Sequence, residues 1–185
     1  MILTKNKLRE AAGKAKKEGY AESYITESYN YSLNYDVFIS HSFSDKDLVI
    51  GLKYLFEKSG YKVYIDWIDD SGLNRDNVNA DTAELIRRRI ETSRSLAYIS
   101  TSNITTSRWC PWELGVADGM SGKACILPVM ESSFKGQEYL GLYPFIEYEL
   151  ISGSDKYEFW VIDQNNNTKY TTLSDWLEGS KLVEH

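Results

Sequence analysis

The segment YDVFISHSFSDKD, residues 35–47, places a short apolar run directly before a polar loop and a helix start. The run at residues 35–41 is typical of a strand that is buried on both faces, as in a parallel sheet. Ser44 suits the N-cap of the helix that follows, and Gly60 suits its end. A buried strand that leads straight into a helix is the basic unit of α/β folds.

The same unit repeats along the chain. Because strands and helices alternate with short connections, the pattern predicts a parallel sheet with helices on both faces. Right-handed crossovers bring every strand-to-helix loop to one edge of such a sheet, where ligands bind. Further strands are predicted at residues 61–66, 94–100, 124–130 and 143–151, and helices at residues 44–60, 80–93 and 108–122.

Two segments flank this core, which we place at residues 35–150. Residues 1–34 contain a basic helix and a polar linker, and residues 151–185 predict a β-hairpin and a short helix added to the sheet. The N-terminal helix is expected to be solvated and to dock loosely, with a membrane-surface or partner-binding helix as the alternative. Its narrow apolar stripe consists of Leu8, Ala11, Ala12 and Ala15.

The composition favours a single globular domain and excludes several classes of function. The chain has 185 residues and a net charge of -6, which argues against nucleic acid as a partner. No apolar run could span a bilayer and no signal peptide opens the chain, so neither a membrane partner nor secretion is expected. Cys110, Cys125 and two histidines provide neither a disulfide framework nor a zinc site, and a reducing cytoplasm fits best.

The third predicted helix opens with SRWCPWELG, residues 107–115, in which two tryptophans surround one carboxylate. Pro111 tolerates only the first turn, so Glu113 lies in the first or second turn, four residues after Trp109. If Trp109 is already helical, both side chains leave the same face, toward the ligand edge. An acid at a helix start also stabilises the helix dipole without any further function, and spacing alone leaves both interpretations open.

The two tryptophans are expected to differ in role. At 100° per residue, Trp112 lies about 60° off the face of Trp109 and shares its face with Val116. We therefore expect Trp109 to line a pocket and Trp112 to pack in the core, so that Trp112→Ala costs more stability than Trp109→Ala.

Neither of the common phosphate-binding glycine motifs, G-x-G-x-x-G and G-x-x-x-x-G-K-[ST], occurs in the chain. A nucleotide would have to be bound without them. Ser42, Ser44 and Asp45 precede a helix whose first N–H groups could bind a phosphate, although ordinary capping also explains Ser44. His41 has no nucleophile beside it in the sequence, and no nucleophile elbow is present.

Three motifs, in this order, resemble those of the bacterial TIR (Toll/interleukin-1 receptor) domain. They are residues 35–47, residues 60–67 (GYKVYIDW) and residues 93–115 (SRSLAYISTSNITTSRWCPWELG), and the resemblance covers about residues 35–150. The matching positions are Asp36, Phe38, Ile39 and Ser40 in the first motif, Val63 and Asp66 in the second, and Ser100, Ser107, Trp109 and Glu113 in the third.

The resemblance implies a flavodoxin-like sheet of five parallel strands. For many bacterial members it also implies cleavage of NAD+, as a substrate rather than a cofactor, at the nicotinamide–ribose bond. Glu113, four residues after Trp109, would then be the catalytic residue, and Trp109 would wall the pocket. By position, the NAD+ contacts implied for the loops after the first two strands are His41, Ser42, Phe43, Asp66, Trp67 and Asp70.

The product implied is ADP-ribose or an isomer of cyclic ADP-ribose. Free-standing bacterial members of this kind resemble the signal-producing component of anti-phage systems such as Thoeris, in which the product acts on a partner effector. Self-assembly through TIR–TIR contacts is a further expectation. The alternatives are a non-catalytic TIR–TIR interaction module, with Glu113 as a helix-start acid, and a nucleotide-binding sensor without turnover.

Overall fold

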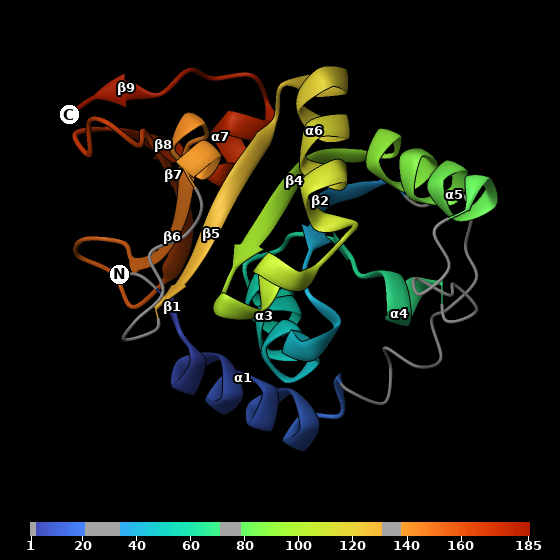
Figure 1. Cartoon of the computed structure of the whole chain (residues 1–185). Coiled ribbons are helices and arrows are strands. Elements are labelled where there is room, and N and C mark those ends of the chain that lie inside the picture. Colours follow the sequence, from blue (N-terminus) through green and yellow to red (C-terminus); the bar gives the residue numbers. More distant parts are fainter. Residues whose placement is uncertain (1–2, 21–33, 71–78, 131–137) are drawn as a thin grey trace.

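One sheet with helices on both faces forms the centre of the computed structural model, which describes residues 3–20, 34–70, 79–130 and 138–185 (Figure 1). Its strands run in the order β3-β2-β4-β5-β6-β7-β8-β9, and the first five are parallel neighbours. The predicted five-stranded parallel sheet is confirmed. The five are β3 (Val63–Tyr64), β2 (Tyr35–Ser40), β4 (Ser93–Ser100), β5 (Ala124–Met130) and β6 (Phe145–Leu150).

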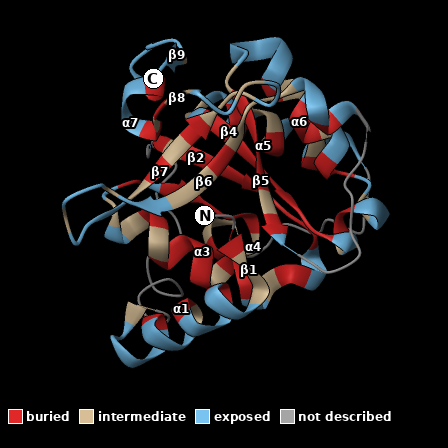
Figure 2. Cartoon of the chain, turned by 90° about the vertical axis from the view of Figure 1, so that its left-hand side faces the viewer, coloured by how far each residue is buried: buried red, intermediate tan, exposed pale blue. Residues whose placement is uncertain are grey.

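Strand β2 shows how the sheet fills two cores. Val37 and Ile39 face the core that contains helix α3 (Lys46–Lys58). Phe38 faces the opposite core, which helices α5 (Ala80–Glu91) and α6 (Cys110–Ser121) cover. Successive strand residues point to opposite faces, so Ser40, which ends the strand, lies on the α6 side like Phe38. In Figure 2 the central strands are buried between helices whose outer faces are exposed.

Helix α1 (Lys5–Lys17) packs closely on α3, so the expectation of loose docking is wrong. Leu8 and Ala15 are fully buried. Gly51 of α3 lies so close to α1 that a Cβ at this position would come within 1.9 Å of the carbonyl oxygen of Leu8. The small side chains that make the apolar stripe narrow also let the two helix backbones approach each other. Most of the linker predicted at residues 22–34 lies outside the described residues.

Both ends of the chain add strands to the sheet. Strand β1 (Leu3–Thr4) pairs in parallel with β5. The predicted C-terminal hairpin is present as β7 (Tyr157–Ile162) and β8 (Lys169–Thr172), which continue the sheet from β6 in antiparallel fashion. Helix α7 (Leu173–Leu177) follows, and β9 (Val183–Glu184) pairs with β8. In the described part of the chain, no helix has the length and apolar character needed to cross a membrane.

The second strand is shorter than predicted. The apolar run at residues 61–66 gives only β3, because the chain turns into the short helix α4 (Asp66–Asp69). The Asp69 carboxylate accepts a hydrogen bond from the backbone N–H of Ile65 at 2.7 Å and stabilises this turn. The rest of the predicted loop, residues 71–78, lies outside the described residues.

Candidate functional site

The loops that follow β2 and β4 enclose a cavity of about 470 Å³, a size typical of small-molecule sites. The first loop contains the 3-10 helix η1 (Phe43–Asp45), and the second contains η2 (Ser102–Thr106). The sheet winds in opposite directions from β2 and β4, so the cavity lies where ligands bind in open α/β sheets. Its described lining residues are His41, Ser42, Phe43, Ser44, Thr106, Ser107, Arg108 and Trp109.

The Asp45 carboxylate ties the two loops together. It accepts hydrogen bonds from the Thr101 hydroxyl and from the Asn103 side-chain amide, each at 2.6 Å. Asp45 occupies the N-cap position of α3 but makes no side-chain capping bond there. Its buried oxygens therefore fix the second loop. Phosphate binding by the first N–H groups of this helix stays a prediction.

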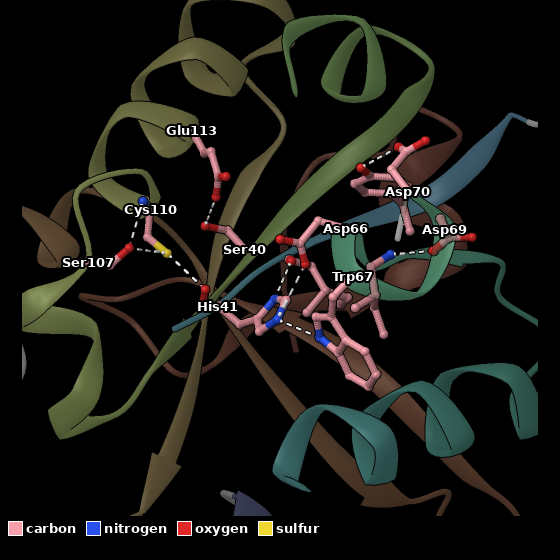
Figure 3. A network of polar contacts seen from close by, with 12 residues as sticks. Ser40, His41, Asp66, Trp67, Asp69, Asp70, Ser107, Cys110 and Glu113 are labelled. Atoms are coloured by element: carbon pink, nitrogen blue, oxygen red, sulfur yellow. Dashed lines mark hydrogen bonds and ion pairs between the residues drawn. The ribbon is translucent and has the colours of Figure 1, made fainter. Parts of the chain in front are cut away.

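Glu113 is fully buried and accepts a hydrogen bond from the Ser40 hydroxyl at 2.6 Å (Figure 3). The backbone of Trp109 is already helical, with φ -86° and ψ -41°, and its carbonyl accepts the Glu113 N–H. The predicted one-turn spacing therefore holds. Trp109 lines the cavity, whereas Glu113 is not among the described lining residues. Because Ser40 is the last residue of β2, the Glu113 carboxylate still points to the carboxyl edge of the sheet, as expected.

The His41 ring is held between two partners (Figure 3). Its Nδ1 lies 3.0 Å from the carbonyl oxygen of Ile39, and its Nε2 lies 3.1 Å from the indole nitrogen of Trp67. Because an indole N–H can only donate, Nε2 accepts and Nδ1 carries the proton, which assigns a neutral imidazole. Asp66 lies 3.6 Å from Nε2. The predicted residues Asp66 and Trp67 therefore gather around His41.

Cys110 fastens the start of α6 to the end of β2. Its thiol donates to the carbonyl oxygen of His41 at 3.2 Å, and the Ser107 hydroxyl donates to the Cys110 sulfur at 3.0 Å. The Cys110 N–H in turn donates to the Ser107 hydroxyl. This buried thiol therefore holds the cavity wall in place. No motif in the sequence indicates that role.

Asp70 does not join the cavity. Both of its carboxylate oxygens accept hydrogen bonds from the Arg89 guanidinium at 2.8 Å, and the Tyr64 hydroxyl donates at 2.7 Å. Burial raises the pKa of Tyr64 well above its ordinary value, and the nearby Asp70 carboxylate adds to the shift. Burial also raises the pKa of Asp69, against the effect of the Ile65 N–H. The substrate contact expected for Asp70 is not supported.

The rim of the cavity carries two cations that the sequence analysis missed. The ammonium of Lys46 lies 3.6 Å from the ring centre of Phe43, which is 70% exposed, and 4.9 Å from that of Trp67. Arg108 is exposed in the lining and has no ion-pair partner within the described ranges. Exposed rings beside cations suit a ligand that carries both aromatic groups and phosphates.

The described residues contain no group of three or more His, Cys, Asp or Glu side chains placed to hold a metal ion. The described lining of the cavity supplies serine and threonine hydroxyls, the His41 ring and the Arg108 guanidinium, and Lys46 lies at the rim. Helix α6 carries two acids, of which Glu113 is buried one turn from Trp109 and Asp118 is exposed.

A family model described as TIR domain matches residues 37–165. A protein of Bacillus cereus (strain MSX-D12) named "Probable 3' cyclic ADP-D-ribose synthase ThsB'" is 41% identical over 165 residues, which are 85% of this chain and 84% of that protein. A Cytobacillus dafuensis protein, named as a cyclic ADP-D-ribose synthase TIR2, is 37% identical over 43% of this chain and 21% of its own length. The crystal structure of the TIR domain of the Toll-related receptor TRR-2 from Hydra magnipapillata aligns with a TM-score of 0.45 and 22% identity, over 57% of this chain and 78% of that one.

Proposed function

The chain belongs to the TIR domain family, and we propose that it is an enzyme that cleaves NAD+ at the nicotinamide–ribose bond. The product is ADP-ribose or an isomer of cyclic ADP-ribose, and it serves as a signal. The names of the two relatives as cyclic ADP-ribose synthases favour ring closure over hydrolysis. By its resemblance to Thoeris proteins, the signal belongs to anti-phage defence, where a partner effector responds to it.

One observation carries this proposal: the buried Glu113 carboxylate lies one helical turn from Trp109, which lines a cavity of ligand size. When the bond breaks, the electron pair leaves with the nicotinamide nitrogen, and positive charge develops on the anomeric carbon of the ribose. A carboxylate in a site that excludes water stabilises this charge far better than it would in solution. Glu113 is therefore the catalytic residue of the proposal.

The fate of the cation decides the product. If water adds to the anomeric carbon and loses a proton, the product is ADP-ribose. If a nucleophilic atom of the same ADP-ribose adds and loses its proton, a ring closes. Trp109 forms a wall of the cavity and is itself only 7% exposed, so it keeps water from the ribose and favours closure.

The rim residues supply contacts for the remainder of NAD+. Phe43 offers an exposed ring for stacking, and Lys46 lies against it. Arg108 offers a planar guanidinium that suits the pyrophosphate. His41 and Ser42 contribute polar atoms to the wall of the cavity. Asp66 and Trp67 act by orienting the His41 ring.

The burial of Glu113 also favours a second candidate, a non-catalytic module that signals through TIR–TIR contacts. As an enzyme, the protein has to exchange the Ser40 hydroxyl for a ribose hydroxyl at Glu113 and has to open the wall at Trp109. Self-assembly of the chain is one way to supply that rearrangement. As a module, the protein needs neither change, and the Ser40–Glu113 bond only stabilises the fold.

Product analysis separates these candidates. The full chain is incubated with NAD+ over a series of protein concentrations, because assembly is part of the proposal. The expected result is stoichiometric release of nicotinamide together with a cyclic ADP-ribose, whose mass is one water lower than that of ADP-ribose. Release of linear ADP-ribose alone would show that the protein is an enzyme that cleaves NAD+, but that it hydrolyses NAD+ instead of forming a ring. Absence of nicotinamide at every concentration would support the interaction module.

A further inference from the structure

A second cavity, of about 420 Å³, lies between helix α1, helix α3 and the β6–β7 hairpin. Among the described residues, its lining shares none with the cavity lined by Trp109. Helix α3 begins at Lys46 near the first cavity and ends at Lys58 in the second, and these twelve residue steps span roughly 18 Å. The described lining residues are Leu3, Lys7, Glu10, Ala11, Lys14, Tyr54, Leu55, Lys58, Tyr148 and Tyr157.

The charged lining of this cavity is mainly positive. Lys7, Glu10 and Lys14 lie on one face of α1, three and four residues apart, and Lys58 faces them from the end of α3. Glu10 offsets part of the charge, and Glu18, outside the lining, pairs with Lys58 at 2.9 Å. With Glu18 counted, three lysines face two carboxylates among the described residues, which leaves a net positive charge. A negatively charged ligand is therefore favoured.

The remaining lining is rich in tyrosine rings. The rings of Tyr148 and Tyr157 stack, with centres 5.1 Å apart and planes inclined by 24°. Tyr157 is 45% exposed at the cavity, whereas Tyr54 is buried and lies 5.5 Å from the Lys58 ammonium. A half-exposed ring that is already stacked on its inner face offers a flat outer surface to a planar ligand.

We propose that this second cavity binds a nucleoside phosphate, with its base stacked on Tyr157 and its phosphate held by Lys14 and the neighbouring lysines. A simple inorganic anion would use the lysines but not the rings, and an uncharged aromatic molecule would use the rings but not the lysines. Only a ligand with both groups uses the whole lining. This proposal is argued only from the residues that line the second cavity and does not depend on NAD+ cleavage.

The test is a titration of the isotope-labelled full chain with AMP, followed through the backbone amide NMR signals. AMP shifts the amides of lining residues on α1, at the end of α3 and in the β6–β7 hairpin, as a set separate from any shifts at residues 41–44 and 106–109. Lys14→Glu weakens AMP binding at this set by at least about tenfold, since it replaces an attractive charge by a repulsive one. Tyr157→Ala weakens it as well. Adenosine and inorganic phosphate each bind more weakly than AMP.

The matched control is Lys16→Glu, which makes the same charge change in the same last turn of α1 but lies outside the lining. It leaves AMP binding at the second cavity within about twofold, because only a screened surface charge is altered. Three results would overturn the proposal: AMP shifts confined to residues 41–44 and 106–109, equal weakening by Lys14→Glu and Lys16→Glu, or phosphate binding as tight as that of AMP. Glu113→Gln abolishes turnover without touching this site, so failure of one proposal is separable from failure of the other.

Discussion

Trp109 fills the core beneath α6 and also lines the cavity. It is 7% exposed and belongs to the same buried cluster as Phe38 and Leu114. Trp112 is half-buried, meets the Trp109 ring edge-on at 5.5 Å, and lies beneath the Arg87 guanidinium at 5.7 Å. Trp109 therefore both packs in the core and lines the cavity. The expectation that Trp112, rather than Trp109, packs in the core is wrong.

We predict that Trp109→Ala costs more stability than Trp112→Ala. Emptying the Trp109 site should lower the free energy of unfolding by roughly 3–5 kcal/mol, the range for a core tryptophan. Trp112→Ala should cost clearly less, because part of that side chain is already in water. Urea unfolding of both variants gives the two values. A larger loss for Trp112→Ala would mean that the α6 side of the sheet is packed differently from the structure described here.

At the scale of elements, the loops after β2 and β4 form one unit because Asp45 joins them. The carboxylate of Asp45 faces a hydroxyl donor on one side and the Asn103 amide donor on the other. A neutral amide at this position would keep only one acceptor atom and would lose the charge that strengthens both bonds.

We predict that Asp45→Asn destabilises the chain by about 1–3 kcal/mol, because the amide keeps one acceptor for Asn103 but loses the second acceptor and the negative charge that strengthens both bonds. It should also slow nicotinamide release, since the loops that line the cavity separate. The double variant Asp45→Asn/Asn103→Asp restores an amide–carboxylate pair and should recover most of both losses. Thermal unfolding and the NAD+ assay measure them. If the double variant is no better than the single one, the link between the loops is not what holds the cavity.

A second contact between elements, that of α1 with α3, depends on Gly51. A methyl group there would overlap the carbonyl of Leu8, which is backbone and cannot rotate away. Gly13 on α1 has nothing within 4 Å of a built Cβ. The two glycines therefore form a matched pair, one at a close approach and one in open space.

We predict opposite effects for the same substitution at these positions. Gly51→Ala should lower stability by about 1–3 kcal/mol, as overpacking does. Gly13→Ala should raise it by up to about 1 kcal/mol, because alanine is the better helix former. The midpoints of denaturant unfolding, compared with that of the unchanged chain at constant m-value, measure both effects. A neutral Gly51→Ala would show that α1 docks as loosely as its sequence suggests, and that residues 1–20 are dispensable for the core.

At the scale of the whole molecule, the sheet separates two cores and carries one cavity at each end of α3. The positions of β2, β4 and β5 could be predicted because each is a continuous apolar run, as burial on both faces requires. Strands β1 and β9 could not, since a strand of two residues has no periodicity.

The candidate site was predictable in part for similar reasons. Pro111 fixes the helix start, and with it the spacing of Trp109 and Glu113. The Ser40–Glu113 bond joins residues 73 apart in the chain, and only the fold brings them together. The Arg89 partner of Asp70 is likewise invisible in the sequence, so a residue placed by motif in the site proved to be engaged elsewhere.

The proposed cleavage of NAD+ depends most directly on the charge of Glu113. The decisive measurement is therefore nicotinamide release from NAD+ by the Glu113→Gln variant. The amide keeps an acceptor for Ser40 but removes the negative charge. Turnover should fall at least about 100-fold, the scale of losing one strong electrostatic stabiliser, with the melting temperature little changed. Asp118→Asn also replaces a carboxylate by an amide, but at an exposed position of α6, and should keep wild-type turnover. If Glu113→Gln releases nicotinamide as fast as Asp118→Asn, Glu113 is a structural acid and the proposed catalytic role is contradicted.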